Sequence, residues 1–237
     1  MNSKHSIKKL FYTIIGITVF SSCTTISYTP KVTLDLSPQT INKSVLVEKI
    51  KDLSPVEDKA NPFLGLSVTN EESLPSGLEL EVTNEIVSDF SNNALFSNIS
   101  RRVENPDFII KGDINKFCGK SEINTFGKVS YFMAMGAIVL SSVTGESAAL
   151  IGVVPMLSWY FGVPISKNTS HIEITLRVYN SKGDLQGTYV GKAEDRTSTN
   201  MYKNKALAVP SMTNKTFSIA IQDIRDQILK DIDKYNR

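Results

Sequence analysis

Residues 171–180 alternate between apolar and polar side chains, and this pattern restricts the fold more than any other feature of the sequence. Aliphatic residues occupy the even-numbered positions from 172 to 178, with charged or hydroxyl side chains between them. Such a period of two is typical of a strand with one buried face. The turn-forming residues 180–184 follow, so residues 185–193 can return as the second strand of a hairpin. The apolar face of this hairpin must be covered by other elements.

Two segments have the period of an amphipathic helix and can provide that cover. In the first, an apolar residue recurs at every fourth position from Leu78 to Phe90. Ser76 and Glu79 form a capping-box pattern at its start, and Asn92-Asn93 would end it. In the second, an apolar stripe runs from Phe217 to Tyr235. We therefore expect both segments to pack as helices on the sheet.

Further strands complete the predicted fold. Ser44–Ile50 and Asp107–Ile114 are rich in β-branched and aromatic residues, and the second alternates. The expected order is strand, helix, two strands, an insertion, a hairpin and a helix. We predict an α+β domain over residues 44–237, with a largely antiparallel sheet of about five strands and the two amphipathic helices on one face.

Parts of this pattern resemble small envelope lipoproteins whose α+β domains are like the N-terminal domain of TolB or the curli-assembly lipoproteins. The resemblance implies a non-catalytic accessory role in envelope assembly, secretion or cell-wall regulation. The matching residues are Val45–Val47 leading to Asp52, the helix from Leu78 that ends in Ala94–Phe96, and Asp107–Gly112.

Residues 1–22 have the composition of a secretory signal peptide. A basic stretch without acidic residues precedes an apolar run of about 11 residues, well short of the ~20 that a membrane-spanning helix needs. The small residues Ser21 and Ser22 follow, directly before Cys23. One interpretation is an ordinary cleaved signal peptide, in which the cysteine is incidental.

The segment Val19–Cys23 resembles a bacterial lipobox, in which the cysteine thiol receives a diacylglycerol and becomes the new N-terminus. Phe20 departs from the usual aliphatic residue at its position. The resemblance implies attachment to a membrane through lipid on Cys23. Because Thr24 rather than Asp follows, it also implies an outer-membrane lipoprotein that faces the periplasm.

Composition limits the remaining classes of partner. Residues 23–43 are rich in Thr, Ser, Pro, Asn and Lys, and we predict that they form a tether between the lipid and the domain. Loss of residues 1–22 removes three lysines and no acids, which leaves 23 basic against 24 acidic residues. Net charge therefore gives no reason to expect a nucleic-acid partner.

Residues 129–165 are almost all apolar or small, interrupted at Thr144–Ser147. We interpret them as an apolar, helical hairpin inserted between two strands. The first arm has about 13 residues, too few to cross a ~30 Å hydrocarbon core. The turn also carries Glu146, whose carboxylate would cost at least ~2.5–3.5 kcal/mol deep in a bilayer. We therefore do not expect this segment to span a membrane.

Three roles remain open for this insertion. It can pack on its own domain, bind an envelope protein or a second copy of the chain, or contact a membrane at shallow depth. An exposed apolar patch of this size is unusual on a monomer, and aromatic residues dominate interface energies. The candidate partner or membrane contacts are Tyr131, Phe132, Ile138, Ile151, Trp159, Tyr160 and Phe161.

Residues suited to catalysis are sparse. Beyond the signal peptide, the chain has one histidine, His171, and besides Cys23 one cysteine, Cys118, so no metal or cofactor is expected. Nucleophile-elbow and phosphate-loop motifs are absent. Asp52, Glu57 and Asp58 share a loop, as paired carboxylates for sugar hydrolysis would, but lysines surround them.

The chain is therefore expected to be a non-enzymatic, lipid-anchored accessory or binding protein. A lipoprotein that assembles with its own copies through residues 129–165 is the alternative. A cell-wall hydrolase is the remote one.

Overall fold

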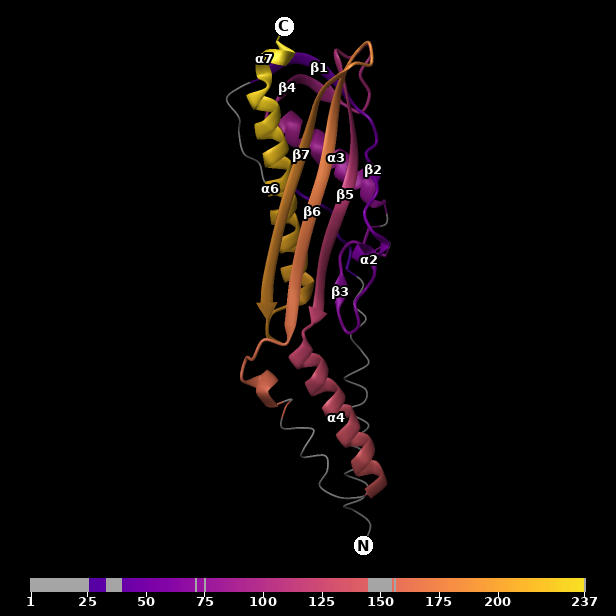
Figure 1. Ribbon diagram of the computed structural model, residues 1–237, viewed down its shortest axis with the longest axis vertical. Coiled ribbons are helices and arrows are strands. Elements are labelled where there is room, and N and C mark those ends of the chain that lie inside the picture. The colour runs from indigo at the N-terminus through magenta and orange to yellow at the C-terminus, as the bar shows by residue number, and fades with distance from the viewer. Residues whose placement is uncertain are drawn as a thin grey trace.

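The computed structural model describes residues 26–32, 40–70, 72–74, 76–144, 155 and 157–236. Figure 1 shows an elongated body with one helix projecting beyond its end. The predicted signal peptide, Cys23 and Ile151 lie outside the described residues, and the side chain of Ile138 is not described either.

Within the described residues, a seven-stranded mixed sheet forms the body, which confirms the α+β class. The prediction of a largely antiparallel sheet of about five strands is wrong, because β1 (Ile41–Val47) pairs in parallel with both β4 (Phe96–Ser100) and β5 (Phe108–Ile123). The connection from β1 to β4 is long and contains two short strands and two helices, and a crossover of this length permits parallel pairing. The strands are, in sheet order, β4 (Phe96–Ser100), β1 (Ile41–Val47), β5 (Phe108–Ile123), β6 (Ser166–Asn180) and β7 (Leu185–Thr199), with β2 (Lys51–Asp52) and β3 (Leu66–Ser67) added to β5.

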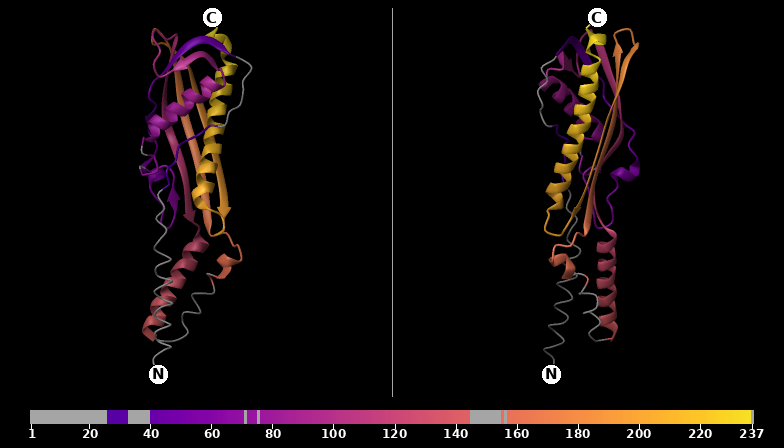
Figure 2. Two further views of the ribbon diagram at one scale, coloured as in Figure 1. Left: turned by 180° about the vertical axis from the view of Figure 1, so that it is seen from behind. Right: turned by 60° about the vertical axis from the view of Figure 1, so that its left-hand side comes forward.

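The two predicted amphipathic helices, α3 (Leu78–Asn92) and α6 (Lys205–Lys230), lie on the same face of the sheet, as Figure 2 shows. They cover the side chains expected to face inward. The aliphatic residues of β6 at positions 172–178 are fully buried, and so are Ile110 and Ile114 of β5. A prediction of two helices on one face is thus confirmed.

Both helix starts differ from the sequence pattern. The predicted capping box is wrong: α3 begins after Gly77, whose φ is 81°, and no side chain caps it. Glu79 instead accepts a hydrogen bond from the backbone N–H of Asp52. The last helix begins at Lys205, well before the apolar stripe, because the side chain of Asn204 accepts from the N–H of Ala206. It ends at Lys230, and the short α7 (Ile232–Tyr235) carries the stripe to Tyr235.

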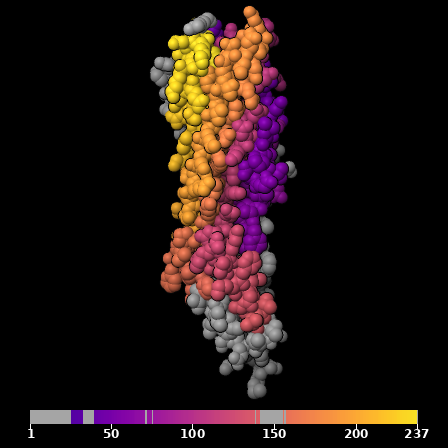
Figure 3. Space-filling model, in the orientation of Figure 1, coloured from indigo at the N-terminus to yellow at the C-terminus, as the bar shows by residue number. Residues whose placement is uncertain are grey.

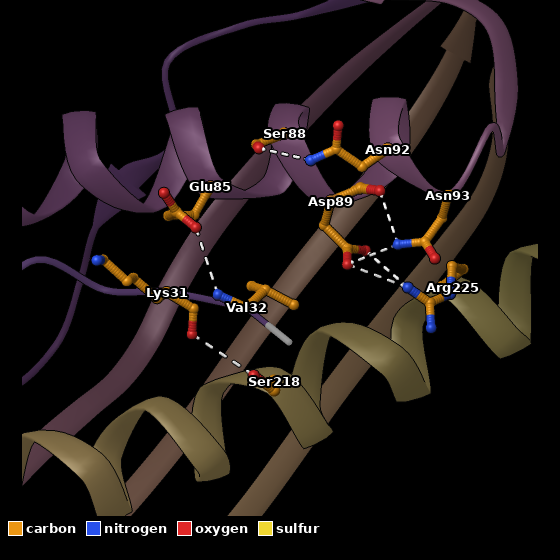
Figure 4. A network of polar contacts seen from close by, with 9 residues as sticks. All are labelled: Lys31, Val32, Glu85, Ser88, Asp89, Asn92, Asn93, Ser218 and Arg225. Carbon is orange, nitrogen blue, oxygen red and sulfur yellow. Dashed lines mark hydrogen bonds and ion pairs between the residues drawn. The ribbon is translucent and has the colours of Figure 1, made fainter. Parts of the chain in front are cut away.

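A buried ion pair joins the two helices (Figure 4). Arg225 Nη1 of α6 lies 3.0 Å from Asp89 Oδ2 and 3.1 Å from Asp89 Oδ1 of α3. The two side chains are 3% and 0% exposed, so water does not solvate them. The side-chain amide of Asn93 donates to Asp89 Oδ1 at 2.9 Å. This network fixes the contact between α3 and α6.

Residues 26–32 also contact these helices, although they belong to the predicted tether. Tyr28 is 3% exposed and donates through its hydroxyl to Asn214 Oδ1 of α6 at 2.8 Å. The backbone N–H of Val32 donates to Glu85 Oε2 of α3 at 3.3 Å, and Ser218 Oγ donates to the carbonyl of Lys31 (Figure 4). This part of the predicted tether is docked on the domain. We call residues 26–32 the docked segment.

The buried pair yields a stability prediction. Replacing Arg225 with Ala leaves the Asp89 carboxylate buried without its cation, and we expect a loss of about 3–5 kcal/mol in the free energy of unfolding. Arg177→Ala is the matched control, since it breaks the more exposed Arg177–Asp113 pair and should cost at most about 1 kcal/mol. Urea unfolding followed by circular dichroism measures both. Equal losses in the two variants would contradict the role given to the buried pair.

Candidate functional site

The helix that projects from the body is α4 (Thr125–Thr144), and it begins directly after β5. Asn124 caps it, because its Oδ1 accepts from the N–H of Gly127 at 2.8 Å. The same side chain donates through Nδ2 to the carbonyl of Pro164 at 2.8 Å, next to the start of β6. One asparagine therefore fixes both ends of the connection between β5 and β6.

One side of α4 exposes an apolar stripe. Phe132 and Val129 are 59% and 51% exposed, and their neighbours on this stripe are similarly open. Spacings of three and four residues place these side chains on a single helix face. No charged residue occurs between Lys128 and Glu146. The members of the stripe are Phe126, Val129, Phe132, Met133, Val139 and Leu140.

Aromatic rings support the base of α4. Phe63 stacks on Phe132 with an interplanar angle of 3° and centroids 6.0 Å apart. Tyr131 meets Phe63 edge-on at 6.2 Å. Phe63 comes from the loop between α2 (Val56–Lys59) and β3, a region in which no sequence pattern indicates a contact residue. Its only signal is a large aromatic side chain between Pro62 and Leu64, in a loop otherwise suited to turns.

Residues 157–163 bring a second apolar group to the same end of the body. Phe161 is 84% exposed and Tyr160 is 63% exposed. The carbonyl of Tyr160 accepts from the hydroxyl of Tyr202 at 2.6 Å, which ties this group to the loop before α6. We call this region, with α4, residues 157–163 and the loop 200–204, the α4 end of the molecule (Figures 1 and 3).

The structure describes most of the predicted contact residues, and all those described belong to the α4 end. Tyr131 and Phe132 are brought together on α4, and Trp159 precedes the exposed Tyr160 and Phe161. Sequence reasoning missed Phe63 and Tyr202. The helical conformation of the first arm agrees with the prediction. The return of the insertion as a hairpin stays a prediction, because residues 145–154 lie outside the described ranges.

Of the loop carboxylates, Asp52 is held by an ion pair and a hydrogen bond. Lys59 Nζ lies 2.6 Å from Asp52 Oδ2, and the other oxygen of Asp52 accepts from the N–H of Ser54 at 2.9 Å. An acid–base pair for hydrolysis needs two carboxyl groups that face one substrate. The ion pair and the hydrogen bond instead give Asp52 a structural role in its loop.

Cys118 and His171, distant in sequence, are directly opposite each other on β5 and β6. Burial raises the pKa of the Cys118 thiol to about 11. Burial, followed by the charge of Lys116, lowers the pKa of His171. No hydrogen bond joins the two side chains in the described contacts. A buried thiol with a raised pKa is the opposite of an activated nucleophile, which needs a depressed one.

This pKa gives a chemical prediction. With the thiol pKa near 11, only about one Cys118 in a thousand is ionised at pH 8. We expect native protein to react with iodoacetamide far more slowly than protein unfolded in urea, as measured by mass spectrometry. Alkylation of the native protein at the unfolded rate would show an exposed thiol and contradict the burial.

Within the described ranges, no group of three or more His, Cys, Asp or Glu side chains is arranged to hold a metal ion. Among the helices that the structure describes, none has the length and hydropathy needed to cross a membrane.

Comparison with known proteins places the chain in no family. No protein-family model and no curated protein matches it. Among solved structures, protein XCC0632 from Xanthomonas campestris, of family DUF330, is similar at TM-score 0.46 and 10% identity, over 87% of this chain and 95% of that one. Protein CT253 from Chlamydia trachomatis gives TM-score 0.37 and 9% identity, over 82% and 98% of the two chains. A lipoprotein candidate from Caulobacter crescentus CB15 gives 0.30 and 9%, over 56% and 73%. At TM-scores below 0.5, these likenesses carry no argument about function.

Proposed function

We propose that this protein is a lipid-anchored, non-catalytic lipoprotein of the bacterial envelope, facing the periplasm, that acts as an accessory or binding subunit. The α4 end is its contact surface for another envelope protein. The apolar stripe of α4 is the observation that carries this proposal. It lies outside the core that α3 and α6 build with the sheet, and its side chains are about half exposed.

Size and composition of this surface support a binding role. Monomeric proteins rarely expose large contiguous apolar patches, and such patches mark interaction sites. Aromatic side chains provide most of the binding energy in protein interfaces. The α4 end presents Phe132, Tyr160 and Phe161, and Phe63 stacks on Phe132; each of the four is more than half exposed.

Lipid attachment at Cys23 and the periplasmic position rest on the lipobox resemblance. A Cys23→Ala variant is expected to lose the lipid, and a mass measurement of the protein extracted from membranes detects this. The lipidated chain should be heavier than its amino-acid sequence from residue 23, and the variant should show no such excess. An unlipidated parent protein would contradict the anchor.

Photo-crosslinking in living cells tests the contact surface. A photo-reactive amino acid replaces Phe132 or Phe161 at the α4 end, and Ser181, in the exposed turn between β6 and β7, is the control position. We expect both α4-end positions to capture the same envelope protein, and Ser181 not to capture it. Val129→Glu should then reduce capture from Phe132, because burying an unpaired carboxylate in an apolar contact is unfavourable.

The identity of the captured protein distinguishes the proposed function from its alternative. Capture of the chain itself would favour the self-assembling alternative. Capture of different proteins at the two positions, or of none at either, would overturn the proposed contact surface.

A further inference from the structure

The docked segment limits how far the lipid can lie from the domain. Cys23 precedes Tyr28 by five residues, which span at most about 18 Å when fully extended. Tyr28 is fixed by its buried side chain and by hydrogen bonds to Asn214 Oδ1 and to the carbonyl of Ser73, the latter at 2.8 Å. A lipid on Cys23 must therefore meet the membrane within about 18 Å of this point.

That distance is too short for one end of the body. Asn214 lies nine residues from the start of α6 at Lys205 and sixteen residues from its end at Lys230. With a rise of 1.5 Å per residue, these separations are about 14 Å and about 24 Å. Helix α6 starts near α4 and ends next to α7 at the opposite end of the body (Figure 1). The lipid can therefore reach the level of the α4 end, but not the end that carries the turn between β6 and β7.

The length of α4 also determines which part of the molecule meets the membrane. Its 20 residues make a helix of about 30 Å, which projects beyond the body (Figures 1 and 3). A lipid that reaches only about 4 Å past the start of α6 therefore brings the projecting α4 to the membrane surface. The exposed stripe of α4 is apolar, so it suits this position.

Side chains around the base of α4 are of the types found where proteins meet bilayers. Tyr160 and Tyr202 are each 63% exposed, and the hydroxyl of Tyr202 donates a hydrogen bond to the carbonyl of Tyr160. Lys128, in the first turn of α4, and Lys203, directly after Tyr202, are also exposed. Tyrosines and lysines at the level of the headgroups are favourable in this way. A molecule lying on α6 would instead press the exposed Asp223 and Asp226 against the membrane.

We infer that the docked segment holds the α4 end against the bilayer, with the stripe of α4 in the interfacial region. This inference rests on the lipid of the proposed function and adds an orientation to it. The envelope protein that the α4 end binds is then one that lies in or on the same membrane.

Depth-dependent quenching tests this orientation in a purified system. Full-length lipidated protein is reconstituted into vesicles of phosphatidylethanolamine and phosphatidylglycerol that contain a spin-labelled lipid. A fluorophore is attached in turn at Phe132→Cys, Phe161→Cys and Ser181→Cys, and the parent protein measures any labelling of the buried Cys118. We expect strong quenching at the first two positions and little at the third. Equal quenching at Ser181 and Phe132 would overturn the orientation.

A linker variant tests the docked segment itself. Insertion of 20 Gly and Ser residues between Thr25 and Ile26 leaves the segment docked but extends the connection to Tyr28 from five residues to 25. Effective concentration falls roughly as the −3/2 power of linker length, so that of the α4 end at the bilayer should fall about tenfold. Quenching at Phe132 should fall with it. Unchanged quenching would show that the docked segment does not set the position.

The two proposals fail separately. The vesicles contain no partner protein, so a failure here leaves the crosslinking result for the proposed function unaffected. Conversely, capture of a soluble periplasmic protein from Phe132 in cells would support the binding role and overturn the orientation.

Discussion

The ion pair between Asp89 and Arg225 is the contact on which the helical layer of this structure depends. Both side chains are almost fully buried, so each charge has lost its water and relies on the other group and on Asn93. Apolar packing alone tolerates sliding of one helix past another, whereas a buried charge pair requires one arrangement. The pair thus sets the position of α3 against α6, and the docked segment follows because it contacts both helices.

The strands and the helices that cover them could be predicted from local periodicity. The parallel pairing of the strands could not, because it joins residues far apart in the sequence. The alternation at residues 172–178 and the stripes of α3 and α6 each determine which side chains are buried, so these elements could be predicted separately. The parallel pairing of β1 with β4 and β5 depends on the crossover through α3, which no local pattern encodes. Likewise, Asp89 and Arg225 read as ordinary helix-surface charges, because their partners are 136 residues apart.

Some residues of the candidate site could likewise be predicted from the sequence, and others could not. The apolar composition of residues 129–165 identified α4 and Tyr160–Phe161 as exceptional, since apolar residues without polar alternation need apolar surroundings. Phe63 and Tyr202 were missed because a single aromatic residue in a polar loop carries no pattern. Residues 26–32 were misjudged for the opposite reason. Their polar, proline-containing surroundings suggest a tether, but a few backbone hydrogen bonds and the buried ring of Tyr28 suffice to dock them.

The proposed orientation at the membrane depends on contacts in the core of the protein. The buried pair positions α6 against α3, and the docked segment is hydrogen bonded to both helices. That segment places residue 23 within about 18 Å of Tyr28, which favours the α4 end over the opposite end as the one nearest a membrane. A flexible tether of 20 residues would allow every orientation, and an exposed apolar helix would then be free to meet other molecules in solution. With the lipid proposed at Cys23, a short connection would instead confine the exposed helix to the membrane surface, where its apolar side chains are tolerated, which is a physical reason for a docked segment next to this cysteine.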